Sequence, residues 1–272
     1  MISKCPKEFN YFIDEIKVKR NLLAGLYINS QNKNFLSKDI NLLENLDANK
    51  SGYFISKFLE KNLMEQLIQS TLNFLSKKFD SDINTNNFNE KFINMQDKFF
   101  HLKMKEIYKG INFDELPFSL EFVESWASIL LKKKVKLFYL KEPSFLVRIV
   151  RPNSIDFNPP HRDIYINRLR NAVNCFMPIM GVNRNSTLPL IPKSHFWLES
   201  DTFRTDLNPI VDGLKFSVPA IIQMKDLSPL VLTRPNVDYG EVMFFSPYCI
   251  HGGGKNTSNE TRMSFEFRFK LK

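Results

Sequence analysis

Cysteine and long apolar runs are scarce in this sequence, and each scarcity excludes a class of protein. The three cysteines, Cys5, Cys175 and Cys249, are far apart, odd in number and without metal-binding spacing. We therefore expect no disulfide framework, and a reducing cytoplasm is the expected location. The absence of any apolar run of about 18 residues predicts that no segment spans a membrane. Residues 1–7 also lack the apolar core of a signal peptide.

Glycine is also rare, with 9 residues, whereas phenylalanine is abundant, with 26, so we expect a core rich in aromatic rings. Three of the glycines stand together at 252–254. A phosphate-binding loop would need a Lys-Ser or Lys-Thr pair opening a helix after the glycines, and none follows. The run therefore indicates a hairpin turn and a close approach of the backbone to a neighbouring group.

Basic residues outnumber acidic ones by 38 to 29, which gives a formal charge of +9. Nucleic-acid binding is one interpretation of such a charge, since phosphate contacts need Lys and Arg. The basic residues are scattered, however, and the densest run, at 132–136, has the character of a solvated helix end. We expect no nucleic-acid partner, and a modest preference for an anionic substrate stays open.

The chain of 272 residues has the length of one domain. The spacing of its apolar residues changes near residue 143. Residues 1–142 are predicted to form a mainly helical covering region. Their apolar residues recur at helical spacing in three stretches, the first of which Ser56 could cap. These helices are expected at 58–75, 90–108 and 120–131.

Residues 143–272 have the short β-rich runs, punctuated by Pro, Asn and Gly, that are typical of an antiparallel jelly roll. The fold class expected is therefore mainly β with flanking helices (α+β). The segment 197–239 is predicted to be an insertion that forms a lid over the barrel mouth. Strands are expected at 145–151, 161–166, 172–179, 188–191, 241–245 and 263–269.

The last of these strands has two different faces. Met263, Phe265 and Phe267 alternate with polar residues, which share the other face because side chains two apart in a strand point the same way. A polar face meets solvent in many sheets. In a barrel covered outside by helices the apolar face packs on the helices instead, and the polar face lines a functional cavity.

Two of the four histidines, with one aspartate, form a candidate metal site. His161 and Asp163 are two apart and are predicted to share one side of a strand, while His251 ends another. Two histidines and one carboxylate are typical of iron(II) enzymes, in which the open positions receive an oxoacid and O2. A structural zinc site would use four protein ligands.

Four ordered segments resemble the phytanoyl-CoA dioxygenase-like family of iron(II)/2-oxoglutarate-dependent oxygenases. The resemblance covers about residues 50–269, with an uncertain correspondence over 197–239, and Gly52-Tyr53-Phe54 also resembles the family's opening. Lys193 replaces a glycine that is usual in the second segment. The four segments are Pro159–Asp163, Leu188–His195, Gly240–Phe245 followed by His251-Gly252, and Arg262, eleven residues after His251.

The resemblance implies a double-stranded β-helix, a jelly-roll barrel of the cupin-like type, packed against the N-terminal helices. It implies Fe(II), 2-oxoglutarate and O2 as cofactor and cosubstrates. It further implies decarboxylation of 2-oxoglutarate to succinate and CO2, coupled to hydroxylation of a substrate C–H bond. Halogenating relatives have Gly or Ala in place of Asp163, so the aspartate favours hydroxylation or a related oxidation.

The family's 2-oxoglutarate-binding arginine corresponds to Arg262, whose planar guanidinium can form two parallel hydrogen bonds with the distal carboxylate. Ser264 shares the same strand face and is a candidate for a further hydrogen bond. Arg148 and Asn174, on neighbouring strands, are candidates for contact with cosubstrate or substrate. For Arg268 we favour an ion pair with Glu266 or with another buried carboxylate.

The substrate itself cannot be read from the sequence, but the positive charge favours a small polar or anionic metabolite, including sugar- or nucleotide-linked ones. Two other function classes stay open. One is a cupin-like metal-dependent enzyme of another reaction type. The other is a non-catalytic jelly-roll binding protein, against which the intact metal triad and Arg262 argue.

Overall fold

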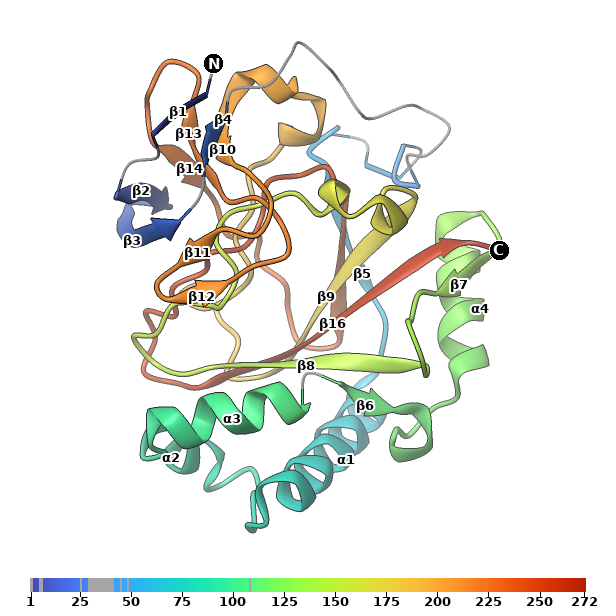
Figure 1. Cartoon of the computed structure of the whole chain (residues 1–272). Helices are drawn as coiled ribbons and strands as arrows, with labels where there is room; N and C mark the ends of the chain where they lie inside the picture. Colours follow the sequence, from blue (N-terminus) through green and yellow to red (C-terminus); the bar gives the residue numbers. More distant parts are fainter. Residues whose placement is uncertain are drawn as a thin grey trace.

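The computed structural model describes residues 2–4, 7–24, 26–28, 42–44, 46–47, 49–107 and 109–272, so Cys5 lies outside the described residues. A large, mainly antiparallel sheet forms the centre of the molecule (Figure 1). Its strands run in the order β5-β15-β9-β16-β8-β6, with β7 paired to β16. They are β5 (Tyr53–Lys57), β15 (Glu241–Phe245), β9 (Ala172–Met180), β16 (Arg262–Leu271), β8 (Ser144–Val150), β6 (Ile111–Asn112) and β7 (Val135–Leu137).

Helices cover the outer face of this sheet, below it in Figure 1 and beside β7. The apolar residues Met263, Phe265 and Phe267 of β16 pack into the same buried cluster as the apolar faces of the helices. No helix in the described part of the chain has the length and apolarity that a bilayer crossing needs. The helices are α1 (Lys61–Phe79), α2 (Phe88–Ile93), α3 (Asp97–Ile107) and α4 (Leu120–Leu131).

Two details of the helical prediction are wrong. Ser56 does not cap the first helix, because it lies in β5 and α1 begins only after Glu60. The continuous helix expected over 90–108 is divided into α2 and α3. Arg151 occupies the corner between them: its Nη1 donates to the carbonyl of Met95 at 2.9 Å, and its Nη2 pairs with the carboxylate of Asp97. The carbonyl of Met95 therefore accepts a hydrogen bond from a side chain and not from the N–H group of a following helical turn.

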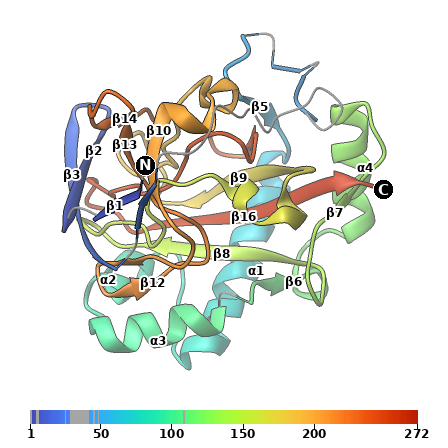
Figure 2. The same cartoon turned by 45° about the horizontal axis from the view of Figure 1, so that its top comes forward.

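The opposite side of the molecule consists of smaller sheets that combine the N-terminus with the segment 202–232 (Figure 2). One sheet has the order β12-β11-β3-β2-β14, and the other has the order β1-β4-β10-β13. The described residues within 2–28 thus form strands and a turn, in a region that was predicted to be mainly helical. These strands are β1 (Ile2–Lys4), β2 (Glu8–Ile13), β3 (Ile16–Ala24), β4 (Leu26–Ile28), β10 (Thr202–Thr205), β11 (Ile210–Val211), β12 (Leu214–Lys215), β13 (Ile221–Met224) and β14 (Leu230–Leu232).

Strand β2 shows why these N-terminal strands form. Phe9, Tyr11 and Ile13 alternate with more exposed residues and are buried against β13 and β14. The hydroxyl of Tyr11 donates to the carbonyl of Gly253 at 2.7 Å, which joins the N-terminus to the loop after His251. The segment 197–239 also contributes strands to both smaller sheets, and its function as a lid stays a prediction.

The expected jelly roll packed on N-terminal helices is confirmed, although its sheets do not close into a continuous barrel. The segments 161–166 and 188–191, expected as strands, form only isolated bridges, which pair His161 with His251 and Leu190 with both Thr233 and His251. The reason is local: Pro160, Pro189 and Pro192 lack the N–H group that a continued ladder requires.

Candidate metal and cosubstrate site

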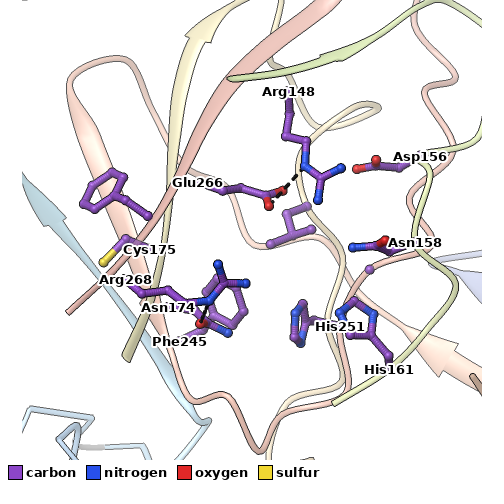
Figure 3. A pocket seen from close by; sticks show the side chains of 13 residues that line it. Arg148, Asp156, Asn158, His161, Asn174, Cys175, Phe245, His251, Glu266 and Arg268 are labelled. Carbon is purple, nitrogen blue, oxygen red and sulfur yellow. Dashed lines mark hydrogen bonds and ion pairs between the residues drawn. The ribbon is translucent and has the colours of Figure 1, made fainter. Parts of the chain in front are cut away.

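A cavity lies between the inner face of the large sheet and the loops that carry His161 and His251. Figure 3 shows polar side chains from both sides pointing into it. The two faces of β16 are arranged as predicted. Glu266 and Arg268 of the polar face line the cavity, while the apolar residues of the strand pack with the helices. The polar lining is Arg148, Asp156, Asn158, His161, Asn174, His251, Glu266 and Arg268.

Backbone pairing brings the two histidines together. The N–H of His161 donates to the carbonyl of His251, and the N–H of His251 donates to the carbonyl of His161, both at 3.0 Å. Their rings lie 4.4 Å apart between centroids. Gly252, at φ +92°, allows this approach, because a Cβ there would lie 3.1 Å from the ring of His161.

In both His161 and His251, a hydrogen bond to a backbone carbonyl uses Nδ1 and leaves Nε2 available for a metal. Nδ1 of His161 lies 2.7 Å from the carbonyl of Pro159, and Nδ1 of His251 lies 3.0 Å from the carbonyl of Cys249. Because a carbonyl only accepts, each Nδ1 carries the proton and each Nε2 keeps its lone pair. Burial and the neighbouring His161 lower the pKa of His251 to about 4, so its ring is in the neutral, metal-binding form at neutral pH.

Asp163 follows at the start of a 3-10 turn, Asp163–Tyr165, and not on the strand that the sequence predicted. Its Oδ1 lies 3.3 Å from Nε2 of His161. Its Oδ2 accepts from Nη2 of Arg268 at 2.9 Å and from Nδ2 of Asn174 at 3.0 Å. Burial opposes ionisation, but the charge of Arg268 holds the pKa of Asp163 well below its usual range.

The three side chains can hold one metal ion, since their ligand atoms all lie within 4.8 Å of one another and all three residues are buried. Oδ2 of Asp163 is occupied by Arg268 and Asn174, so Oδ1, which lies beside Nε2 of His161, is the oxygen left for a metal. Two imidazoles and one carboxylate suit iron(II) and leave positions for other ligands. Arg268 also donates from Nε to Oδ1 of Asn174 at 2.8 Å, which fixes both groups that support the aspartate.

Arg262, the expected cosubstrate arginine, is fully buried and lies behind Asp156, outside the cavity lining. Its Nη2 lies 2.8 Å from Oδ2 of Asp156, and its Nη1 donates to the carbonyl of Ser186 at 3.0 Å. Its Nε has no hydrogen-bond partner among the described residues.

Ser264, two residues further along the same face of β16, is also buried, and its hydroxyl likewise has no partner in the described part of the chain. Buried donors without an acceptor are uncommon in folded proteins. An Nε–H of Arg262 and a hydroxyl of Ser264 on one strand face suit an anionic oxygen, such as a carboxylate of 2-oxoglutarate. The residues present therefore fit the cosubstrate.

Arg148 lies on β8, opposite Ser264 in the strand register, and lines the cavity. Its Nε is 3.2 Å from Oε2 of Glu266, and its guanidinium also faces the carboxylate of Asp156 (Figure 3). Of the two partners considered for Arg268, the one observed is another buried carboxylate, Asp163, because Glu266 is taken by Arg148.

Sequence reasoning missed Asp156 and Asn158, which reach the cavity from the loop after β8. Neither belongs to a motif of the resemblance. One signal was present in principle: an arginine expected on a buried strand face needs a counter-charge, and Asp156 is the acidic residue between β8 and His161.

The turn at Ser194–Phe196 packs next to the segment that carries His251. Ser194 Oγ donates to the carbonyl of Ile191 at 2.6 Å and accepts from the N–H of Ile250 at 2.8 Å, next to His251. Lys193 has φ +65°, which explains why glycine is usual at this position.

Comparison with known proteins identifies a family. The pattern described as Phytanoyl-CoA dioxygenase (PhyH) matches residues 49–264, which is most of the chain. No curated protein matches the sequence.

Several solved structures are similar in fold. AviO1 from Streptomyces viridochromogenes Tue57 is 13% identical, with 89% of this chain and 96% of that chain covered and a TM-score of 0.49. The non-heme alpha ketoglutarate dependent carbocyclase SnoK is 12% identical, with 87% and 85% covered and a TM-score of 0.49. The epimerase SnoN, in complex with Fe3+, alpha ketoglutarate and nogalamycin RO, is 14% identical, with 84% and 83% covered and a TM-score of 0.45.

Proposed function

Because the chain belongs to the phytanoyl-CoA dioxygenase family of iron(II)- and 2-oxoglutarate-dependent oxygenases, we propose that it hydroxylates a C–H bond of a small polar or anionic metabolite, releasing succinate and CO2. The observation that carries the proposal is the buried triad of His161, Asp163 and His251, in which one ligand atom of each residue lies within 4.8 Å of the others. The two alternatives left open by the sequence, another type of metal enzyme and a non-catalytic binding protein, are disfavoured by this family membership.

His161, Asp163 and His251 are proposed to hold the iron, which supplies the oxidative chemistry when 2-oxoglutarate and O2 are bound. The protein's own contribution is to fix the three ligands before the metal arrives. The carbonyls of Pro159 and Cys249 set the histidine protonation, and Arg268 with Asn174 directs the free oxygen of Asp163 inward.

Arg262 and Ser264 are proposed to bind the distal carboxylate of 2-oxoglutarate. The unpartnered Nε of Arg262 and hydroxyl of Ser264 support this assignment, as does the position of Arg262, eleven residues after His251. For Asn174, the bond to Asp163 supports a positioning role next to the metal. Arg148 is proposed to contact cosubstrate or substrate, since it lines the cavity beside Glu266.

Hydroxylation is proposed over halogenation because the carboxylate of Asp163 occupies the position where a halide would need an open site. A polar substrate is supported by the lining, in which Arg148, Asn158 and Glu266 offer both donors and acceptors. A cytoplasmic location and the absence of a nucleic-acid partner stay predictions. The described cysteines, Cys175 and Cys249, are buried free thiols.

The proposal is tested by succinate formation from 2-oxoglutarate with iron(II) and O2, over a panel of polar and anionic metabolites. We expect iron-dependent succinate from the wild type and at least about a thousandfold less from His161→Ala, because one of three metal ligands is lost. His101→Ala, which changes an exposed histidine on α3, is the matched control and should behave as wild type. Equal activity in wild type and His161→Ala, or no iron-dependent succinate with any compound, would contradict the proposal.

A further inference from the structure

We propose that Asp156 competes within the protein for the distal-carboxylate site on Arg262, so that 2-oxoglutarate binds only as Asp156 turns away. This inference rests on the proposed function and concerns how that same site is loaded. Its starting point is the ion pair between Oδ2 of Asp156 and Nη2 of Arg262, at 2.8 Å and almost fully buried. A carboxylate of the protein thus occupies part of the guanidinium that the cosubstrate's carboxylate needs.

Asp156 pairs with Arg262 and also stands between Arg262 and the cavity. Asp156 lines the cavity and Arg262 does not, so a ligand that enters from the metal side meets the aspartate first. The other Nη of Arg262 is bound by the carbonyl of Ser186, and the ring of Phe176 lies 5.7 Å from the guanidinium carbon. A bidentate contact between a second carboxylate and Arg262 therefore requires Nη2 to leave Asp156.

The backbone around Asp156 is fixed, which confines the exchange to its side chain. Its N–H donates to the carbonyl of Gly254 at 2.6 Å, and Ile155 pairs with Lys255 in a β-bridge. Within the side chain, Oδ1 accepts from the N–H of Phe157 at 2.7 Å. A rotation of the carboxylate is thus a small movement that leaves the loop and the metal ligands in place.

A second arginine can receive the displaced charge. The guanidinium of Arg148 faces Asp156 from the cavity side (Figure 3). Burial opposes ionisation of Asp156, yet the charges of Arg262 and Arg148 together lower its pKa. On release from Arg262 the carboxylate would move toward Arg148 instead of toward apolar groups, so it would not be left as an isolated buried charge.

The competition reduces cosubstrate affinity by the fraction of molecules in which Arg262 is accessible. We therefore expect Asp156→Asn to lower the Kd for 2-oxoglutarate by about tenfold, a value that corresponds to about one molecule in ten being accessible in the wild type. Pyruvate, a 2-oxoacid without a distal carboxylate, has no use for Arg262, and its Kd should stay unchanged.

The measurement is calorimetric titration of the anaerobic, iron(II)-loaded protein with 2-oxoglutarate and with pyruvate. Glu266→Gln is the matched control, because it removes another cavity carboxylate, one that pairs with Arg148 and not with Arg262. Asp156→Ser provides a second variant that keeps an oxygen for the N–H of Phe157. A crystal structure of the wild type with metal and 2-oxoglutarate is expected to show Asp156 turned from Arg262 toward Arg148.

An unchanged or higher Kd for 2-oxoglutarate in folded Asp156→Asn or Asp156→Ser would overturn the inference. Equal tightening by Glu266→Gln, or equal tightening for pyruvate, would also overturn it, because the effect would then be general electrostatics. Asp156 still paired with Arg262 in the cosubstrate-bound crystal would do the same without any variant. If the wild type and all variants fail to bind 2-oxoglutarate, the proposed function fails together with the inference.

Discussion

The two ends of the cavity are prepared for their ligands in different ways. At the metal end, His161, Asp163 and His251 are held by hydrogen bonds to the protein, and one ligand atom of each lies within 4.8 Å of the others. At the other end, Arg262 is already neutralised by Asp156 and has only part of its guanidinium free. On the proposed assignments, the three metal ligands are already gathered, whereas the cosubstrate end must first exchange one carboxylate for another.

Charge balance explains why the protein tolerates both arrangements. Arg148, Arg262 and Arg268 are each paired with one carboxylate, of Glu266, Asp156 and Asp163 in that order. An unpaired buried guanidinium would be costly, so Arg262 needs a counter-ion whenever the cosubstrate is absent. A divalent cation and a dianionic oxoacid then add no net charge to the cavity.

The largest change in affinity at one end of the cavity is expected from Arg262→Met, which removes the charge at nearly constant side-chain length. The Kd for 2-oxoglutarate should rise about a hundredfold, since truncating one partner of a buried charge pair costs several kcal/mol. Iron(II) affinity should stay the same, because Arg262 does not contact the triad. Calorimetric titration with each ligand separates the two ends, and a loss of iron affinity as large as the loss of cosubstrate affinity would show that the ends are not independent.

A smaller effect, at the opposite end, is expected from Arg268→Lys. The guanidinium bonds Asp163 and Asn174 at once, whereas a single ammonium cannot reproduce this planar geometry. We expect iron(II) affinity to fall about tenfold, as is typical for groups that orient a metal ligand. Competition with a chelating dye measures the affinity. Arg148→Lys is the control, since Arg148 pairs with Glu266, and an equal loss in both variants would refute the orienting role.

The smallest effect is expected from Ser264→Ala, and it has opposite signs for stability and binding. The buried hydroxyl has no partner in the described structure, so its removal should leave the melting temperature unchanged or slightly higher. The Kd for 2-oxoglutarate should rise about fivefold, the equivalent of one hydrogen bond. Thermal unfolding with and without 2-oxoglutarate measures both changes.

Thr261→Val is the matched control for this variant, because it removes a second buried hydroxyl without a described partner, three residues before Ser264 and just outside β16. It should not change the Kd for 2-oxoglutarate. An equal rise in both variants would show that Ser264 has no specific contact with the cosubstrate.

Much of the large sheet could be predicted from the sequence, because its signals are local. The alternation in β16 indicated which face would meet the helices, and the bounds expected for β15 agree with those observed. The family and its cofactors were also predictable, since ordered motifs specify them, and the match over residues 49–264 confirms the resemblance.

The remaining features depend on partners distant in sequence. Asp163 was expected on a strand, but the proline-rich segment before it supports only a single bridge, at His161. The pairing of Arg262 with Asp156 joins residues 106 positions apart, and no local pattern encodes it. The strands within residues 2–28 had a period-two signal in β2, yet β2, β3 and β4 also pair with strands of the segment 202–232, which the motifs did not cover.

The hydrogen bond between Tyr11 and Gly253 joins the N-terminal strands to the metal loop, although these strands lie outside the family match. The family match begins at residue 49, so an experimenter guided by homology alone would start the protein there. Such a truncated chain would lack Phe9, Tyr11 and Ile13, and the apolar residues of β13 and β14 would lose the strand that covers them. It would also lose the hydrogen bond that supports the glycine two residues after His251. The part of the chain that supports the loop after His251 therefore extends beyond the part that the family match covers.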